Sequence, residues 1–451
     1  MRARIALKRL LTRPAEELRT AAALGLYLFI LLSSYYVLKT VREALILAEN
    51  GAAVKVYAAG AQAAMFVALV PVYNRLANRL PRVQLIGAVL AFFSVVLAAF
   101  AVAGHLGVRI GVPFFLWIGV FNVFVIAQFW SFAADLFSEE DGIRVFPLIG
   151  IGGTLGGWLG SLAAKRMFAG RDPYQIIWIA CAALLFCIPL TYFISRHRTM
   201  QPEAERTRLP LASADGLRLV LRDPYLRLIA ILTVLLNVCS TTGEYIFGSV
   251  ATEHARALIY AGQNHGLTDK QIIGTIYGTV FTWVNAVGLV LQVLVVPLAF
   301  RSIGVGGALF ILPVIVLAGY SVVAVAPVLA VAQIVRIIES SVSYSMQSTT
   351  NNSLFLRTVR EAKYKAKIAI DTVFWRMGDV LSAALTFAGT TLLSLGRSAF
   401  ALANVALASV WTVVAAALFL RYKKGRRRSE VGSEERRKHY VGETESVTSH
   451  C

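Results

Sequence analysis

The sequence has few charged residues for its length. Only 15% of the 451 residues are Asp, Glu, Lys or Arg, whereas a soluble protein of this size has about 25%. Hydrophobic residues make up 57%, and the mean hydropathy is +0.67. This composition excludes a soluble globular protein. Apolar runs of about 20 residues recur along the chain, and each is long enough to cross a hydrocarbon core of roughly 30 Å. We therefore expect an all-helical, polytopic membrane protein.

Residues that carry catalytic or metal chemistry are also scarce. The four cysteines, Cys181, Cys187, Cys239 and Cys451, form no CxxC pair. The six histidines have no metal-ligand spacing, and the chain contains neither a nucleophile motif nor a GK[ST] phosphate loop. We expect no bound metal, no cofactor and no enzyme activity, ATP hydrolysis included.

The net charge of +19 is distributed in basic segments that alternate with less basic ones. This pattern is typical of the cytoplasmic loops of a membrane protein, and it favours contact with anionic membrane lipid over nucleic-acid binding. We expect a multi-pass protein of the cell inner membrane. Both termini and the loop 197–225 are predicted to be cytoplasmic.

Twelve apolar segments are candidate transmembrane helices. They lie near 21–44, 54–75, 83–104, 110–135, 143–168, 174–195, 226–250, 271–298, 304–325, 327–355, 365–393 and 397–421. The polar loop 197–225 separates an N-terminal six-helix half, 1–196, from a C-terminal six-helix half, 226–421. The tail 422–451 is basic and lacks apolar periodicity, so we expect a disordered cytoplasmic tail.

The two halves resemble each other weakly. DLFSEEDGIR precedes the glycine-rich fifth span, and SLFLRTVREAKYK precedes the eleventh. Such similarity fits a major-facilitator-like architecture, in which two pseudo-symmetric six-helix halves hold a substrate site near the membrane midplane. We expect the protein to be a monomer.

Charged and aromatic side chains share one stripe of the first span. Tyr35, Lys39, Arg42 and Glu43 recur at helical spacing within AAALGLYLFILLSSYYVLKTVREALIL, residues 21–47. A charge at bilayer depth costs a few kcal/mol or more unless it faces a protein interior or a water-filled cavity. The stripe therefore predicts the lining of a transport pathway.

The tenth span carries a second polar stripe. Arg336, Ser340, Ser343 and Gln347 follow one another at steps of three and four residues, and Glu339 lies close enough to neutralise Arg336. We favour a cavity lining, while an interhelical hydrogen-bond seam would use the same residue types.

Three further spans carry polar residues whose roles stay open. Glu244, in the seventh, has no cation within one turn of its own helix, so its partner must come from another helix. Lys39, Arg42 and Arg336 are the candidates.

Asn285, in the eighth span, suits packing and cavity lining equally. Arg376 and Asp379, in the eleventh, suit substrate contact or a gating salt bridge between the halves.

The fifth span is rich in glycine. Gly150, Gly152, Gly153, Gly156, Gly157 and Gly160 lie within GIGGTLGGWLG. Small residues at four-residue spacing allow membrane helices to approach closely. We therefore interpret the glycines as packing residues rather than as a phosphate-binding loop.

Two long stretches resemble a known family. QFWSFAADLFSEEDGIRVFPLIGIGGTLGG, residues 128–157, and LRTVREAKYKAKIAIDTVFWRMGD, residues 356–379, are similar to the bacterial and plastid type of ATP/ADP translocase. The segment YYVLKTVREALIL, residues 35–47, resembles the opening helix of that family. The resemblance implies a major-facilitator-like fold and the exchange of nucleotides, typically external ATP for internal ADP with phosphate.

The resemblance also implies which residues contact the substrate. The cation of the opening helix falls on Arg42, with Lys39 close by, and the acid of the seventh span falls on or near Glu244. The basic residue of the eleventh span is Arg376, where the family has Lys. The family's acid in the fourth span has no match here, and Asn122 lies nearest.

A polyphosphate needs several cations at once, and an Arg guanidinium binds phosphate oxygens in pairs. Four cations could bind the phosphates, namely Lys39, Arg42, Arg336 and Arg376. An aromatic ring could stack on the base, and the candidates are Tyr35, Tyr36 or Trp375. The predicted substrate is a nucleotide or another organic anion.

Two other functions remain open. One is a proton- or solute-coupled carrier of another metabolite, with Glu244 as a proton carrier. The other is a membrane scaffold or sensor that transports nothing, although a scaffold has no need of buried charges on several helices.

Overall fold

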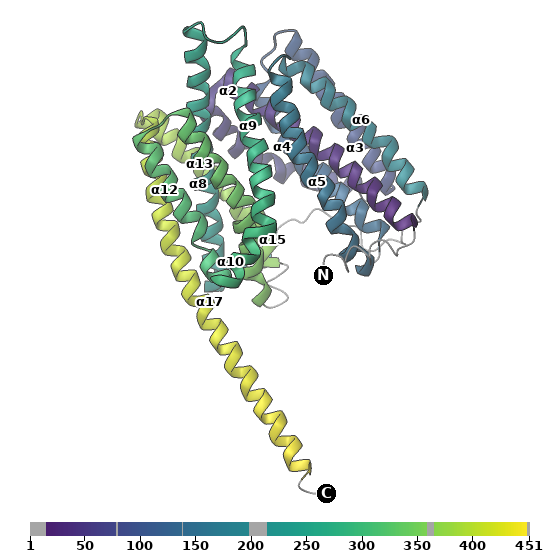
Figure 1. Cartoon of the computed structure of the whole chain (residues 1–451), viewed down its shortest axis with the longest axis vertical. Coiled ribbons are helices and arrows are strands. Elements are labelled where there is room, and N and C mark those ends of the chain that lie inside the picture. The colour runs from purple at the N-terminus through teal and green to yellow at the C-terminus, as the bar shows by residue number, and fades with distance from the viewer. Residues whose placement is uncertain (1–14, 78–79, 138, 198–213, 359–364, 449–451) are drawn as a thin grey trace.

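The computed structural model describes residues 15–77, 80–137, 139–197, 214–358 and 365–448. Throughout these residues the regular structure is helical, without a β-strand. Two groups of helices stand side by side, the N-terminal group in purple and blue and the C-terminal group in green and yellow (Figure 1).

Five helices build the N-terminal group. They are α2 (Ala15–Ala77), α3 (Arg82–His105), α4 (Gly111–Leu136), α5 (Glu139–Phe168) and α6 (Pro173–His197). α2 is interrupted at Gly51, whose φ of 83° lies in the left-handed region that glycine adopts without steric cost. The bend at Gly51 divides α2 into the first two predicted spans.

The helices of the C-terminal group are more often interrupted. Its α-helices are α8 (Pro224–Tyr260), α9 (Asp269–Val290), α10 (Val296–Ser302), α11 (Gly304–Ala308), α12 (Ile311–Val325), α13 (Leu329–Val342), α14 (Ser348–Leu354), α15 (Lys367–Ala369), α16 (Trp375–Phe387) and α17 (Arg397–Thr448). π-helical turns lie among them, including η1 (Leu291–Val295), η2 (Ser343–Gln347), η5 (Ile370–Phe374) and η6 (Ala388–Leu392). A 3₁₀ turn, η3 (Phe355–Arg357), follows α14.

Helices lie at the approximate positions of the twelve predicted spans, and the number of crossings stays a prediction. Among the described residues, nine helices are long and apolar enough to cross a membrane. One of these, α2, supplies two crossings because of its bend at Gly51. Two more crossings come from the polar helices 329–357 and 367–392, which the π-helical turns η2, η5 and η6 interrupt. The protein is therefore an all-helical, multi-pass membrane protein.

Two segments are more regular than the sequence predicts. Part of the loop 197–225 forms α7 (Ala214–Arg222), while residues 198–213 lie outside the described residues. α17 continues to Thr448, so the structure has a helix where we expected disorder after residue 421. The tail is rich in Arg, Lys and Glu, which favour helix, and extending an existing helix avoids the cost of nucleating a new one. The division of the chain at 197–225 stays a prediction.

Glycine allows α5 to pack closely on α2. A Cβ atom added at Gly152, Gly156 or Gly160 would meet the backbone of α2, and at Gly160 it would lie 2.6 Å from the Cα of Ser33. The Ser33 hydroxyl donates to the carbonyl of Gly156 at 3.2 Å. The packing interpretation is therefore confirmed for this face of α5, which we call the glycine seam.

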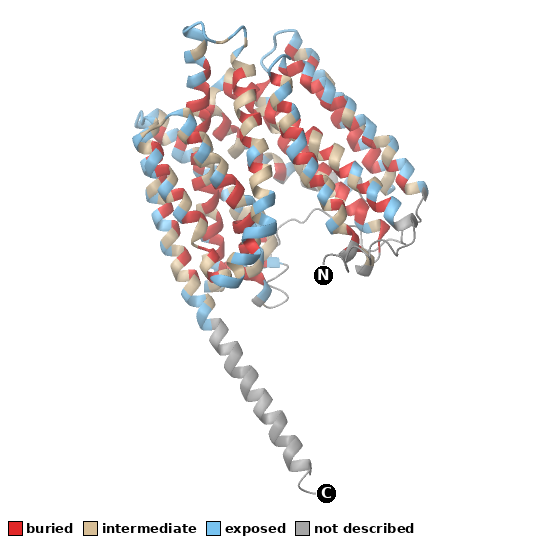
Figure 2. Ribbon diagram, in the orientation of Figure 1, coloured by how far each residue is buried: buried red, intermediate tan, exposed pale blue. Residues whose placement is uncertain are grey.

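Buried residues concentrate where helices meet, and exposed residues cover the outer surface of the bundle (Figure 2). Many of the exposed side chains are large and apolar, among them Phe92, Phe186, Leu298 and Val413. An apolar outer surface is what a hydrocarbon environment requires. Cys181, Cys187 and Cys239 are buried within the bundle, where a thiol behaves as a small hydrophobe.

Candidate functional site: a charged cavity between the two halves

A chain of ion pairs begins within α2. On a straight helix Glu43 and Lys55 would lie about 18 Å apart, at about 1.5 Å per residue. Because α2 bends at Gly51, the Lys55 ammonium instead contacts the Glu43 carboxylate. Arg42 also donates to Glu43, with its Nε 3.0 Å from Oε1. These side chains are almost fully buried, with 2% of Glu43 and 7% of Lys55 exposed.

The series of ion pairs continues into the C-terminal half. Glu244 of α8 receives the Lys55 ammonium on Oε1 and the Arg336 guanidinium of α13 on Oε2. The Tyr277 hydroxyl of α9 also donates to Glu244, at 2.8 Å. Lys55 therefore joins one carboxylate from each half, and this pairing connects the two halves at the centre of the protein.

Arg336 has a second acidic partner. Its Nη1 lies 3.2 Å from the buried carboxylate of Glu339, one turn along α13. Glu339 accepts a further hydrogen bond of 2.7 Å from the Tyr320 hydroxyl. The expected neutralisation of Arg336 by Glu339 is therefore confirmed, and Arg336 contacts two carboxylates at once.

Lys39 differs from these cations. No carboxylate of the described residues lies within ion-pair distance of its ammonium, which lies instead among aromatic rings. The ring centroids of Phe281, Tyr36 and Tyr344 are 4.3, 5.3 and 5.9 Å from Nζ. Cation–π contact stabilises a cation but leaves its charge uncompensated. Lys39 is thus able to bind an anion without first losing an acidic partner.

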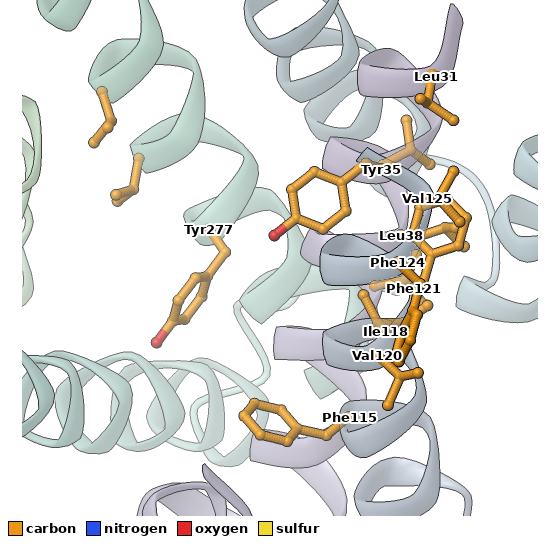
Figure 3. Packing of buried hydrophobic residues seen from close by; sticks show 14 of the residues in the cluster. Leu31, Tyr35, Leu38, Phe115, Ile118, Val120, Phe121, Phe124, Val125 and Tyr277 are labelled. Carbon is orange, nitrogen blue, oxygen red and sulfur yellow. The ribbon is translucent and has the colours of Figure 1, made fainter. Parts of the chain in front are cut away.

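Two cavities meet at Lys39. The first, which we call the wide cavity, has a volume of about 620 Å³. Its polar and aromatic wall consists of Tyr35, Tyr36, Lys39, Asn122, Trp130, Thr154, Asn285, Gln292, Tyr344 and Ser345. Tyr35 of α2 belongs to the apolar cluster, where its ring stacks on that of Phe121 with the two centroids 6.3 Å apart, and it also lines the wide cavity (Figure 3).

The second cavity, which we call the ion-pair cavity, has a volume of about 200 Å³. Its charged wall consists of Lys39, Arg42, Glu43, Lys55, Glu244 and Arg336. Four of these side chains are basic and two are acidic, so the wall carries an excess of positive charge. This arrangement suits an anion with several negative oxygens.

The two cavities follow one another along α2. The residues of α2 that line the wide cavity run from Leu28 to Lys39, and those that line the ion-pair cavity run from Lys39 to Ala59. The wide cavity is therefore nearer the start of α2. α2 begins and α17 leaves the bundle on the same side (Figure 1), and the wide cavity lies towards that side.

Polar contacts close the opposite side. Glu49, at the end of the first span, accepts from the Lys270 ammonium at 2.9 Å and from the backbone N–H of Gly111 at 2.7 Å. Lys270 also donates to the Tyr174 hydroxyl at 2.8 Å. Lys270 begins α9 of the C-terminal half, whereas Glu49, Gly111 and Tyr174 belong to the N-terminal half. These contacts, which we call the far-side latch, hold the two halves together beyond the ion pairs.

Most of the predicted site residues line the two cavities. Tyr35, Lys39, Asn122 and Asn285 line the wide cavity, and Lys39, Arg42, Glu43, Glu244, Arg336 and Ser340 line the ion-pair cavity. Five do not line either one: Glu339, Ser343, Gln347, Arg376 and Asp379. That any of these residues binds substrate stays a prediction.

The π-helical turn η2 explains the position of two of the five. The stripe from Ser340 through Ser343 to Gln347 assumes an α-helix, but η2 contains about one extra residue per turn. The register shifts, and Tyr344 and Ser345 face the wide cavity instead. Gln347 is buried and donates to Asn351 at 2.9 Å.

Arg376 and Asp379 form a pair of their own. Arg376 Nη1 lies 3.0 Å from Asp379, which also accepts from Asn237 of α8 at 3.1 Å. The Arg376 guanidinium lies over the Phe66 ring, 4.5 Å from its centroid. The salt bridge itself lies within α16, while its contacts with Phe66 and Asn237 reach both halves.

Sequence reasoning missed Lys55, Tyr277 and Tyr344. Lys55 is the only charged residue in the apolar run 52–69, which was a sufficient signal under the cost of intramembrane charge. Of the three partners considered for Glu244, Arg336 is confirmed, and Lys55 is the second cation. Tyr277 and Tyr344 gave no signal because single tyrosines are common in apolar helices.

Comparison with known proteins supports the fold. No family model matches the sequence. At 21% identity over 298 residues, 57% of the chain aligns with ADP,ATP carrier protein 1 of Chlamydia muridarum. The chain spans about half the length of this curated relative, because the alignment covers 54% of it.

Solved transporter structures match nearly the whole chain. The nucleoside transporter NupG superposes with a TM-score of 0.62 at 13% identity, covering 91% of this chain and 100% of NupG. A bacterial homologue of the human lysosomal transporter Spinster, inward-facing and unoccupied, gives 0.60 at 14% identity, covering 92% and 98%. The POT family transporter PepTSo gives a TM-score of 0.62 at 12% identity, covering 91% of this chain and 98% of PepTSo. At these identities the likeness establishes the fold, and the chain has the major-facilitator-like fold of polytopic transporters.

Proposed function

We propose that the protein is a secondary active transporter that exchanges nucleotides of the ATP/ADP type by alternating access. It performs no covalent chemistry. In this proposal it lies in the inner membrane with both termini in the cytoplasm, so that the wide cavity opens towards the cytoplasm. The basic loops support this orientation, and the similarity to a chlamydial ADP,ATP carrier supports a nucleotide as the substrate.

The observation that carries the proposal is the position of Lys39. This uncompensated cation lies where the wide cavity meets a smaller cavity walled by Arg42, Lys55 and Arg336. A phosphate group that reaches Lys39 is adjacent to three more cations, each already held by a carboxylate. Phosphate oxygens would compete with Glu43 and Glu244 for these cations, since both are oxygen anions that form charge-assisted hydrogen bonds.

This competition couples binding to the motion of the halves. Lys55 joins Glu43 to Glu244 across the interface between the halves. When a phosphate draws Lys55 or Arg336 away from Glu244, the interface loses a central link, and the far-side latch formed by Glu49 and Lys270 remains as the next barrier. Rocking of one half against the other around a fixed site is the usual form of alternating access.

A proton-coupled carrier is the second candidate, and no contact of Glu244 favours it. A proton carrier must exchange its proton with solvent, whereas each oxygen of Glu244 contacts a cation in this conformation. A scaffold would not need a cavity of about 620 Å³, a size typical of small-molecule sites.

Uptake into proteoliposomes tests the proposal. Purified protein is reconstituted into vesicles loaded with ADP, and uptake of labelled ATP is measured, with empty vesicles as the comparison. We expect uptake that requires internal ADP or ATP and does not change when the pH gradient is collapsed. Uptake that follows a pH gradient and ignores internal nucleotide would instead identify the proton-coupled carrier.

A further inference from the structure

We propose that the wide cavity is a subsite for the nucleobase, so that the nucleotide lies with its phosphates beyond Lys39 and its base towards the side where α2 begins. This inference rests on the proposed function and adds the orientation of the substrate and the residues that select it. It follows from the different chemistry of the two cavities.

The distribution of charge separates the two subsites. Among the residues that the structure describes, Lys39 is the only charged one in the wall of the wide cavity, and it lies at the inner end. The ion-pair cavity has six charged wall residues. A phosphate in the wide cavity would contact only one cation. An uncharged ring in the ion-pair cavity would displace water from the charged groups without replacing the hydrogen bonds that the water made. Each part of a nucleotide therefore fits one cavity.

The wall of the wide cavity suits a flat ring. On α5, Gly150, Gly153 and Gly157 line it with backbone, on the face of the helix next to the glycine seam. A Cβ added at Gly150 would meet nothing within 4 Å. The indole of Trp130 on α4 faces the same cavity and offers a surface on which any base can stack.

Amide side chains in the same wall can read the edge of a base. Asn122 of α4, Asn285 of α9 and Gln292 of η1 all line the wide cavity, and an amide side chain has both donor and acceptor groups. Asn285 is held in place by hydrogen bonds to the Phe281 carbonyl at 2.8 Å and the Ser161 hydroxyl at 3.3 Å. The two halves both contribute, since Asn122 belongs to the first and Asn285 to the second.

Thr154 provides a way to fill the wide cavity without disturbing the ion pairs. It lines the wide cavity, and its hydroxyl donates to the Gly150 carbonyl of its own helix, at 3.1 Å. Thr412 on α17 makes the same kind of bond, to Ala408 at 2.8 Å, and lines neither cavity. Thr154→Leu and Thr412→Leu are therefore a matched pair.

The test compares binding of ADP with binding of inorganic tripolyphosphate, which has phosphates but no base. Dissociation constants are measured on the purified full-length protein. We expect Thr154→Leu to weaken ADP binding by about tenfold or more, the scale of one base-stacking contact, and to leave tripolyphosphate binding unchanged. Thr412→Leu should change the binding of neither ligand, and Lys39→Gln should weaken the binding of both ADP and tripolyphosphate.

Equal effects of Thr154→Leu on the two ligands would overturn the subsite, as would ADP binding that does not change. If Thr154→Leu does not fold, Gly150→Leu takes its place, with Gly25→Leu as its control. Gly25 has the same open space around its Cβ position and does not line the wide cavity. The proposed function fails separately, when the wild-type protein exchanges no nucleotide in proteoliposomes.

Discussion

The two halves contribute differently to the site. Across the described residues, every π-helical turn lies in the C-terminal half, and two of these turns, η1 and η2, line the wide cavity. π-helical turns occur frequently at functional sites, where they alter which side chains face a ligand. The N-terminal half instead crosses the membrane in α-helices that pack closely at the glycine seam.

The cations on the cavity walls also differ between the two halves. The N-terminal half presents Lys39 without an acidic partner, whereas the C-terminal half presents Arg336 between two carboxylates. The N-terminal half can therefore bind an anion directly at Lys39. The C-terminal half can bind an anion at Arg336 only after the anion displaces a carboxylate. We infer that the N-terminal half receives the substrate and the C-terminal half responds to it.

The largest expected effect is on stability. Arg336→Gln leaves Glu244 and Glu339 buried with one cation fewer, and removing one partner of a buried ion pair costs about 3–5 kcal/mol. We expect the free energy of unfolding in detergent to fall by this amount, and Glu244→Gln in the same chain to recover part of it. Arg376→Gln is the control, because that side chain is 33% exposed and has a single acidic partner. Equal losses for the two variants would contradict the proposed role of the central ion pairs.

Lys39→Gln should lower nucleotide affinity and leave stability nearly unchanged. No carboxylate of the described residues loses a partner, so stability should change little. Nucleotide affinity should fall by about ten- to a hundredfold, since a hydrogen bond to a charged group contributes about 1.5–3 kcal/mol. Binding titrations measure the loss, and Lys39→Arg should retain most of the affinity because it keeps the charge. A variant that unfolds more easily but binds normally would show that Lys39 is structural.

Gly156→Ala tests the packing of the N-terminal half. The added Cβ would lie 3.0 Å from the Cα of Phe29 on α2, and overpacking of this kind costs about 1–3 kcal/mol. Gly150→Ala, on the adjacent face of the same helix, should be neutral or gain up to about 1 kcal/mol, as expected when Ala replaces Gly within a helix. Thermal unfolding of the two variants distinguishes the faces. Equal effects would mean that α5 and α2 are not packed as described.

The smallest effect concerns the far-side latch. The Lys270 side chain is 25% exposed, and pairs of this kind contribute up to about 1 kcal/mol. Lys270→Gln should raise the population of the state open to the far side by up to about fivefold. Val56 is buried and lines the ion-pair cavity, so the change should appear as faster labelling of Val56→Cys by a membrane-impermeant reagent added on the far side. Arg397→Gln removes the ion pair with Glu253, which lies wholly within the C-terminal half, and should not change labelling. Identical rates for both variants would exclude the latch.

The sequence predicted the spans well because hydropathy decides them. Burying a run of about 20 apolar residues in lipid outweighs any local preference, so the limits of the spans are visible in the composition. The site was predicted through the cost of intramembrane charge, which correctly singled out Lys39, Arg42, Glu244 and Arg336 as residues on a cavity wall.

What the sequence did not provide depends on backbone geometry. Lys55 reaches Glu43 only because of the bend at Gly51. Ser343 and Gln347 leave the cavity wall only because η2 changes the helical register. A helical-spacing argument assumes a regular helix, and it fails at the interruptions where this protein builds its site.

For the proposed exchanger, the uncompensated ammonium of Lys39 has a consequence for the energetics of transport. Without substrate, the cavity carries an excess positive charge at membrane depth, and moving one elementary charge through the full membrane potential involves about 2.3 kcal/mol per 100 mV. An empty carrier would take this charge with it whenever the halves rock, whereas a bound anion compensates it. Under a membrane potential the return of the empty carrier is therefore opposed in one direction, and a carrier built in this way favours exchange of one anion for another over net movement of a single one.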